Sequence, residues 1–376
     1  MKRDATRALR VGNVPVGGGA PVSVQTMLND DPHDEAALVA HLRSCAEEGA
    51  DIVRLTIPDL AAADTLARVR AASPVPIVSD IHFDYRCALA AIAAGTDALR
   101  LNPGNIGGRE RVAEVARAAK AHGVPIRIGV NFGSLEKELD AAVRRGELPV
   151  AEALCRSALG HLKLLEDEGF REVAISVKAS NVADTLAAYR LLAERTDCPL
   201  HVGLTEAGTF LRGTVHSSVA LGILLAEGIG DTIRVSLTDT PEREVRVGLE
   251  ILRALGMRPK GPSVTSCPTC GRTRVGLKAA AEAVEAALAP AYRRHLAAGR
   301  PEADFPRVAV MGCVVNGPGE AKGADIALCG GAGEFILFVK GEAVGRVPER
   351  DAAARVADMV AGLEAGEKGK KVKEVN

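Results

Sequence analysis

Eight short runs rich in valine and isoleucine alternate with eight longer stretches of helical period, and this alternation constrains the fold more than any other feature. We predict strands at Val22–Gln25, Ile52–Leu55, Val75–Ser79, Ala98–Leu101, Ile126–Val130, Val173–Val177, Leu200–Leu204 and Thr232–Ser236. We predict helices near 34–48, 59–72, 84–94, 109–122, 150–168, 181–195, 213–227 and 241–255. Eight such units in about 235 residues predict an α/β fold, a (β/α)₈ barrel of TIM type. A doubly wound sheet stays open as an alternative, because periodicity does not show whether a parallel sheet closes.

The alternation stops at residues 256–263, a segment with two prolines and two glycines that neither a helix nor a central strand would accept. We therefore expect a barrel domain over 1–256 and a second, small α+β domain over 264–366. In the second domain we predict helices at 277–297 and 350–364 and strands at Val308–Met311 and Phe335–Val339.

Positively charged residues recur in five of the predicted strands, which is costly in a barrel whose strands are buried on both faces. The cations are Arg54, Arg100, Arg127, Lys178 and Arg234. Any one of them could pair with a neighbouring carboxylate, but five together predict a cluster at the rim where barrel loops build active sites. Guanidinium groups bind phosphate oxygens in pairs, so the cluster predicts a compact polyanion such as a diphosphate.

The same rim should carry polar groups for orientation or proton transfer. These candidates are Asp80, His82, Asn102, Asn105, Asn131, Thr205 and Glu206. Overall the chain is balanced, with 47 Lys and Arg against 48 Asp and Glu, so no global field attracts nucleic acid or an anionic membrane. It also lacks a signal segment and a long apolar run, so we expect a cytoplasmic protein.

Four of the eight cysteines follow residue 260, and three of them are spaced as metal ligands. Cys267 and Cys270 form a Cys-x₂-Cys pair, and Cys313 follows after 42 intervening residues. This spacing is compatible with an iron–sulfur cluster, a zinc site or a redox pair, and Cys329 is a possible fourth ligand. Cys45, Cys87, Cys155 and Cys198 stand singly in apolar stretches and are expected to be small buried side chains.

Long motifs make the chain similar to a known family. Ser-Cys-Pro-Thr-Cys-Gly-Arg at 266–272 and Gly-Cys-Val-Val-Asn-Gly-Pro-Gly-Glu-Ala at 312–321 closely resemble the bacterial 4-hydroxy-3-methylbut-2-enyl diphosphate synthase family, called IspG or GcpE. Further matching segments lie in the family's order at 24–25, 79–85, 100–106, 127–131, 176–180, 204–208 and 228–236. Ser180 and Ser236 lie in these segments and join the predicted substrate site.

The resemblance implies a [4Fe-4S] cluster held by Cys267, Cys270, Cys313 and Glu320, which makes Cys329 structural. It implies the substrate 2-C-methyl-D-erythritol 2,4-cyclodiphosphate, whose diphosphate suits the cations inferred above. The implied reaction is a two-electron reductive dehydroxylation and ring opening in the non-mevalonate isoprenoid pathway, supplied by reduced flavodoxin or ferredoxin. Glu206, as proton donor, and Asn316 would then lie near the leaving hydroxyl. A zinc-stapled barrel that binds a phosphate ligand without redox chemistry is the alternative.

The link between the domains bears on assembly. The last barrel helix ends on the face opposite the catalytic mouth. That helix is about 22 Å long, and the link 256–263 spans at most roughly 26–29 Å. Little length remains to bring Cys267 over the mouth of the same barrel. We therefore expect a homodimer in which each cluster domain caps the partner's barrel, as the resemblance also implies.

Overall fold

The computed structural model describes residues 2–259, 261–262, 264–315, 319 and 322–365. It divides into two compact units, Met1–Arg258 and Pro259–Asn376. Each unit has a hydrophobic core of its own. In the described part of the chain, no helix is both long enough and apolar enough to cross a membrane.

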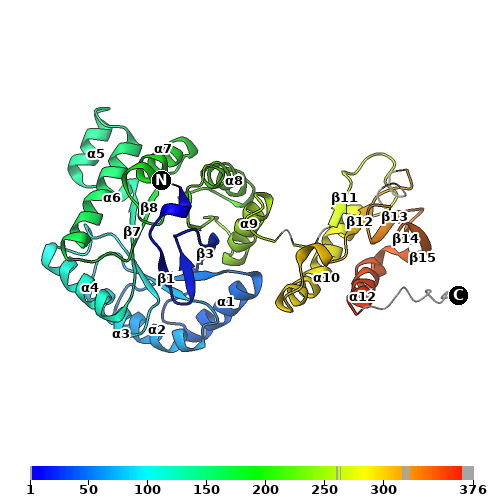
Figure 1. Cartoon of the computed structure of the whole chain (residues 1–376), viewed down its shortest axis with the longest axis horizontal. Coiled ribbons are helices and arrows are strands. Elements are labelled where there is room, and N and C mark those ends of the chain that lie inside the picture. Colours follow the sequence, from blue (N-terminus) through cyan, green and yellow to red (C-terminus); the bar gives the residue numbers. More distant parts are fainter. Residues whose placement is uncertain (1, 260, 263, 316–318, 320–321, 366–376) are drawn as a thin grey trace. The chain divides into compact units, whose positions relative to one another are not determined.

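The first unit is the predicted barrel, with a ring of helices around parallel strands (Figure 1). Its strands are β3 (Ser23–Met27), β4 (Ile52–Thr56), β5 (Ile77–Asp80), β6 (Ala98–Leu101), β7 (Ile126–Asn131), β8 (Val173–Lys178), β9 (His201–Val202) and β10 (Thr232–Ile233). They pair in the order β8-β7-β6-β5-β4-β3-β10-β9, and a bridge between Ile175 and Leu200 joins the two ends. This closure rules out the doubly wound alternative.

The barrel helices begin and end close to their predicted bounds, and capping side chains fix the first turns of several of them. They are α1 (Glu35–Glu48), α2 (Leu60–Ala72), α3 (Tyr85–Ala93), α4 (Arg109–His122), α6 (Val150–Asp167), α7 (Val182–Arg195), α8 (Phe210–Ala226) and α9 (Pro241–Ala254). Asp34, Asp59 and Asn181 each accept a hydrogen bond from a backbone N–H of the first turn that follows them. A short extra helix, α5 (Lys137–Arg144), was not predicted.

An unpredicted hairpin closes the N-terminal end of the barrel. Its strands β1 (Leu9–Val11) and β2 (Val14–Val16) are antiparallel. Their apolar side chains pack on the first residues of the barrel strands, among them Ile52 and Ala98. The turn is Gly12-Asn13, with Gly12 at φ 57°, a two-residue pattern that favours tight hairpins and that the strand prediction overlooked.

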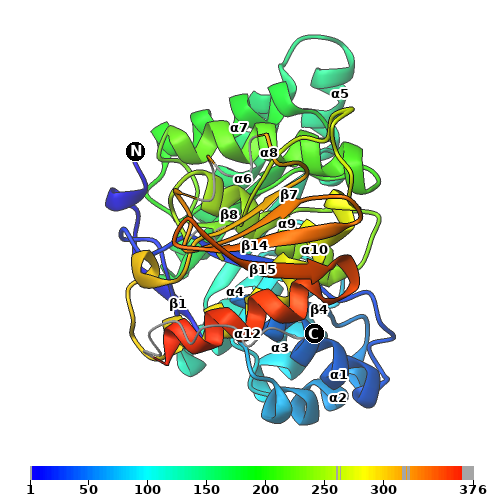
Figure 2. The same cartoon turned by 90° about the vertical axis from the view of Figure 1, so that its right-hand side faces the viewer.

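The second unit is a five-stranded mixed sheet with two helices on one face (Figure 2). The strands are β11 (Val264–Ser266), β12 (Val308–Met311), β13 (Ile326–Gly330), β14 (Glu334–Val339) and β15 (Glu342–Pro348), and the helices are α10 (Leu277–Ala297) and α12 (Ala352–Glu364). Along β12, Val308 and Val310 pack with the helices, whereas Ala309 and Met311 lie in a separate apolar cluster. Strands β11, β13 and β15 were not predicted, since they lie in short or glycine-rich stretches.

Candidate functional site

The carboxyl ends of the barrel strands surround a polar cavity of about 240 Å³. Eleven of the twelve residues predicted to bind substrate line it. The predicted lining residues are Arg54, Asp80, His82, Arg100, Asn102, Arg127, Asn131, Lys178, Thr205, Arg234 and Ser236. Strand closure therefore brings together side chains that stand up to 182 positions apart in the sequence.

A buried carboxylate holds two of the cations in place. Asp80, at the end of β5, lies 3.5 Å from Arg54 Nε and accepts a 3.1 Å hydrogen bond from Arg100 Nη1. Burial acts to raise the pKa of Asp80, but the charges of Arg54 and Arg100 outweigh it and hold that pKa below its usual value. Asp80 therefore stays ionised and orients both guanidinium groups into the cavity.

Arg234 has a comparable anchor that the sequence analysis missed. Glu244, on α9, accepts hydrogen bonds of 3.2 Å from both Nε and Nη2 of Arg234. The same carboxylate accepts hydrogen bonds from Thr26 Oγ1 and from the backbone N–H of Leu237. Glu244 is only 3% exposed, although it stands in a predicted surface helix. The sequence offers only a weak indication of this ion pair, namely that Glu244 stands ten residues after Arg234.

Arg127 lies deeper than predicted. It is the second residue of β7, so its side chain enters the barrel interior below the rim. There its Nη1 donates to Oε1 of Gln25, on β3, which lies on the opposite side of the barrel. Its Nε and Nη2 are buried and have no hydrogen-bond partner among the described residues. These orphaned donors are suited to an anion in the cavity.

The cavity has an excess of positive charge. Five cationic side chains and Asp80 line the cavity, and Glu244 lies behind Arg234, which gives a formal excess of three positive charges. No carboxylate in the described part of the chain pairs with Lys178, which is 7% exposed. Burial, and then the charge of Arg234, lowers the pKa of Lys178 well below its usual range. Burial likewise lowers the pKa of Arg54 to about 10. A bound polyanion would reverse both effects.

Two glycines let long cationic side chains cross the barrel. A Cβ at Gly129 would collide with the guanidinium group of Arg100, which donates to the Gly129 carbonyl. A Cβ at Gly203 would lie 2.5 Å from the carbonyl oxygen of Arg234 and 3.1 Å from Lys178 Nζ. At Gly203 only glycine leaves enough space, because the clash is with backbone, whereas a side chain at Gly129 would displace the Arg100 guanidinium group.

Two predicted residues are not among those that line the cavity. Ser180 is exposed on the loop after β8. Glu206 is also exposed, in the loop between β9 and α8, and its φ of 54° is uncommon for a residue other than glycine. The side chain of His82, a lining residue, is 45% exposed and its Nε2 lies 3.8 Å from Asp80.

The second unit brings two of the three predicted thiols to adjacent strand ends. Cys267 follows β11 and Cys313 follows β12, and these strands are parallel neighbours. The backbone N–H of Gly312 donates to Cys267 Sγ at 3.4 Å. Cys270 is exposed, and a hydrogen bond from the backbone of Arg272 lowers its pKa, which favours the thiolate form that binds metals.

Two other residues predicted for this site, Asn316 and Glu320, lie outside the described residues. Cys329 is fully buried within β13, opposite Met311 in the sheet register. Burial, and then the neighbouring Cys313, raises its pKa to about 11.

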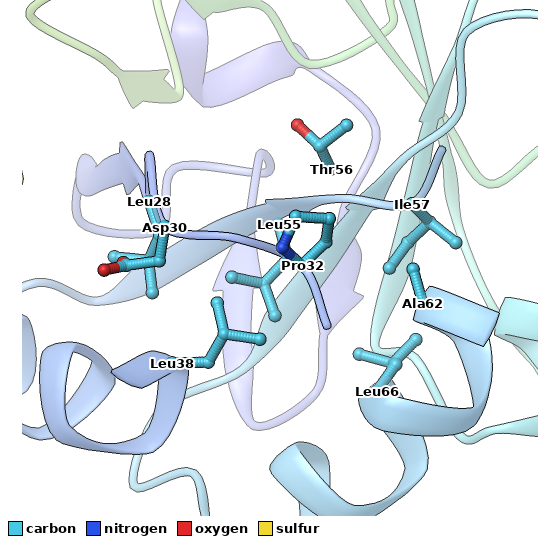
Figure 3. Close-up of a pocket in the computed structure, with 9 residues that line it drawn as sticks. All are labelled: Leu28, Asp30, Pro32, Leu38, Leu55, Thr56, Ile57, Ala62 and Leu66. Atoms are coloured by element: carbon cyan, nitrogen blue, oxygen red, sulfur yellow. The ribbon is translucent and has the colours of Figure 1, made fainter. Parts of the chain in front are cut away.

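A second hollow in the barrel is too small for a ligand. It lies among β4, α1, α2 and the loop that follows β3, and Figure 3 shows its mostly apolar lining. Its volume of about 20 Å³ is close to what a single water molecule needs. We regard it as a packing gap.

Comparison with known proteins agrees with the two-unit division. Residues 6–249 match the GcpE TIM-barrel domain, and residues 263–362 match the GcpE protein C-terminal domain. A relative from Geobacter sulfurreducens, 4-hydroxy-3-methylbut-2-en-1-yl diphosphate synthase (flavodoxin), is 55% identical over 93% of this chain and 95% of its own length. Synthases of the same name from Lawsonia intracellularis and Maridesulfovibrio salexigens are 50% and 52% identical, over 93% and 92% of this chain and 93% of each relative. The chain therefore belongs to the GcpE family.

Proposed function

We propose that this chain is a 4-hydroxy-3-methylbut-2-en-1-yl diphosphate synthase that converts 2-C-methyl-D-erythritol 2,4-cyclodiphosphate by reductive dehydroxylation and ring opening. The observation that carries the proposal is the buried cavity with an excess of three positive charges. A cyclic diphosphate bears a negative charge on each phosphate, and its size suits a cavity of about 240 Å³. The names of the curated relatives support the same activity.

Substrate binding would use the cations in two ways. Arg54, Arg100 and Arg234, which carboxylates already orient, would bind phosphate oxygens with little loss of side-chain entropy. Two donors of Arg127 have no partner and Lys178 has no ion pair within the described residues, so these two side chains would gain most from the anion. Asn102, whose buried Nδ2 has no hydrogen-bond partner among the residues that the structure describes, and Asn131, Thr205 and Ser236 would orient the sugar-derived hydroxyls.

The thiols of the second unit fit an iron–sulfur cluster. Cys267 and Cys313 follow adjacent strands, and backbone N–H groups approach the sulfurs of Cys267 and Cys270, as is common around such clusters. We propose Cys267, Cys270, Cys313 and Glu320 as ligands of a [4Fe-4S] cluster. Such a cluster would pass electrons to the substrate one at a time.

Proton delivery is assigned to Glu206, with Asn316 beside the leaving hydroxyl. Glu206 has the left-handed backbone conformation that, outside glycine, is concentrated at functional sites. It directly follows Thr205, which lines the cavity. Ser180 would contact substrate only if its loop moved toward the cavity, so its role is the weakest of the predicted ones.

We propose a homodimer in which each second unit completes the partner's barrel. The short link after α9 supports this, because α9 runs away from the face that carries the cavity. Helix α8 supports self-association, since it exposes a stripe of apolar side chains at every fourth residue: Leu211, Val215, Val219 and Ile223. Flavodoxin, named for the relatives, or a ferredoxin would be the electron donor in the cytoplasm.

Turnover of the cyclodiphosphate tests the proposal. Anaerobically purified protein is incubated with the substrate and a chemical reductant, and the product is identified by mass. We expect a product that has lost one oxygen atom, together with a broad absorbance near 400 nm and about four irons per chain. Colourless protein with one zinc and no turnover would instead support the zinc-stapled binding protein.

A further inference from the structure

Outside the cavity, one group of side chains gathers three different metal-ligand types. His41 and Cys45 lie on α1, and Glu242 is the second residue of α9. Because His41 and Cys45 are four residues apart, they share one face of α1. One ligand atom from each residue lies within 4.8 Å of the other two. Cys45 is fully buried, whereas the other two are partly buried.

The histidine of this group is already oriented as a ligand would be. Its Nδ1 lies 2.7 Å from Asp30 Oδ2, and its Nε2 lies 3.1 Å from Glu242 Oε1. A carboxylate on one ring nitrogen is the usual support for a histidine that binds a metal through the other. Glu242 is supported too, because Ser44 Oγ donates to its Oε1 at 2.6 Å.

Asp30 lies beside buried apolar side chains. It lies at the edge of the small hollow of Figure 3, and its carboxylate points away from the apolar side chains there. Leu28 and Leu38, which also line that hollow, are 5% and 3% exposed. The loop after β3 therefore presents Asp30 to His41 from a well-packed support.

We propose that His41, Cys45 and Glu242 bind one divalent transition-metal ion with the ligand preference of zinc, with water in the fourth position. Imidazole nitrogen, thiolate and carboxylate oxygen are the ligands that zinc uses in proteins. Tetrahedral zinc holds such atoms about 3.3–3.6 Å apart. His41 Nε2 and Glu242 Oε1 lie 3.1 Å apart, a little closer than this distance, and all three ligand atoms lie within 4.8 Å of one another. Binding an ion therefore needs the sulfur to approach by at most roughly 1 Å.

The charges and protons balance on binding. The ion replaces the proton of the Cys45 thiol and the proton between His41 and Glu242, and both protons leave to solvent. The resulting site is neutral, because thiolate and carboxylate together match the charge of the ion. Burial, and then the charge of Glu242, raises the pKa of Cys45 to about 12, so without an ion the sulfur stays a protonated and unreactive thiol.

The place of the site in the fold indicates what it would do. Helix α1 follows β3, the first barrel strand, and α9 follows β10, the last. These two strands pair directly where the barrel closes. An ion bound between α1 and α9 would cross-link the first and last units of the barrel on its outer side. We therefore assign it a structural role, which predicts a gain in stability.

Zinc retention by the full-length protein with its iron–sulfur cluster in place tests the site. The anaerobic protein is treated with a chelator, incubated with Zn²⁺ alone, desalted, and analysed for zinc and iron per chain. We expect about one zinc per chain in the wild type and a rise in Tm of roughly 5 °C. Cys45→Ala should lose the zinc and the Tm rise while its iron content is unchanged.

Three matched variants make the result specific. Cys155→Ala removes another fully buried helical cysteine, and should keep the zinc. His33→Gln removes a histidine that also lies between two carboxylates, Asp31 and Asp59, but is exposed and lacks a thiol, and it should keep the zinc as well. His41→Gln should lose it, and decides the matter if Cys45→Ala fails to fold. Wild type without zinc, or equal zinc in His41→Gln, would overturn the proposal.

Discussion

The two candidate sites of this chain are built in opposite ways. In the barrel, the cations stand on strands or directly after them, and carboxylates hold three of them before any ligand arrives. In the second unit, the thiols stand on loops after β11 and β12. A backbone N–H donates to Cys267, and the backbone of Arg272 and the side chains of Arg272 and Thr273 approach the sulfur of Cys270. The barrel thus orients its cations before substrate binds, at the cost of keeping like charges close together. The thiol site, in contrast, needs its cofactor to complete it. Losing a ligand should therefore destroy the thiol site, and losing a cation should only weaken the barrel site.

The largest expected effect separates two cysteines of the second unit. Cys313→Ser should lose the cluster, because a hydroxyl is a poor iron ligand, and turnover should fall to background. Cys329→Ser should keep iron and activity near wild type, because Cys329 lies within the sheet. Iron per chain and the visible spectrum measure both. If a folded Cys329→Ser lost its iron, the ligand set would instead be four cysteines.

Glu206→Gln tests proton delivery in the barrel unit. We expect turnover to fall by roughly 10²- to 10⁴-fold, because the amide cannot donate the proton. Substrate affinity and the cluster spectrum should change little, since the side chain does not line the cavity. Near-normal turnover would remove Glu206 as the donor.

Mixing two inactive chains tests whether the two sites meet between subunits. Cys267→Ala lacks a cluster ligand and Glu206→Gln lacks the proposed donor. If the active site forms between subunits, each mixed dimer regains one intact pair, and an equal mixture should recover about a quarter of wild-type activity. Mass measurement should first confirm that mixed dimers are present. No recovery in confirmed mixed dimers would mean that the link folds back within one chain.

Replacing a single cation of the cavity should have a smaller effect, and only on the affinity for substrate. Arg127→Met or Lys178→Met should weaken substrate binding by ~1.5–3 kcal/mol, roughly 10- to 150-fold. The cluster spectrum should stay unchanged. Arg109→Met, which removes an exposed ion pair with Asp167, is the control and should change affinity by less than twofold. Unchanged affinity in both cavity variants would place the phosphates elsewhere.

The smallest effect is expected at the anchor behind Arg234. Glu244→Gln keeps the shape of the side chain but removes the charge that orients the guanidinium group, so affinity should fall by ~0.5–1.5 kcal/mol. Glu250→Gln, an exposed glutamate of the same helix, should leave affinity unchanged. Titration of substrate binding compares the two variants. Equal affinities would show that Arg234 does not need Glu244 for binding.

Much of the barrel could be predicted because its signal is local. The hydrophobic period of each strand and helix, and capping residues such as Asp34 and Asp59, are readable within short windows. The hairpin of β1 and β2 and the strands β11, β13 and β15 were not predicted. Strands β1, β2 and β11 have only three residues each, and β11 and β13 pair with a strand that is distant in the sequence or follows a long connection. Strand β13, for example, is stabilised by hydrogen bonds to both β12 and β14, which its own residues do not indicate.

The sequence by itself determined the kinds of groups in this protein: a repeated strand–helix pattern, five cations carried within that pattern, and three thiols in family-specific motifs. Only the tertiary structure decided which groups meet. It placed Arg127 below the rim beside Gln25, put Glu244 behind Arg234, left Ser180 outside the cavity lining, and brought His41 and Cys45 to Glu242. The physical reason is that local propensity acts over a few residues, whereas barrel closure pairs β3 with β10 across about two hundred residues. No local pattern encodes the contacts made where the first and last strands of the barrel pair.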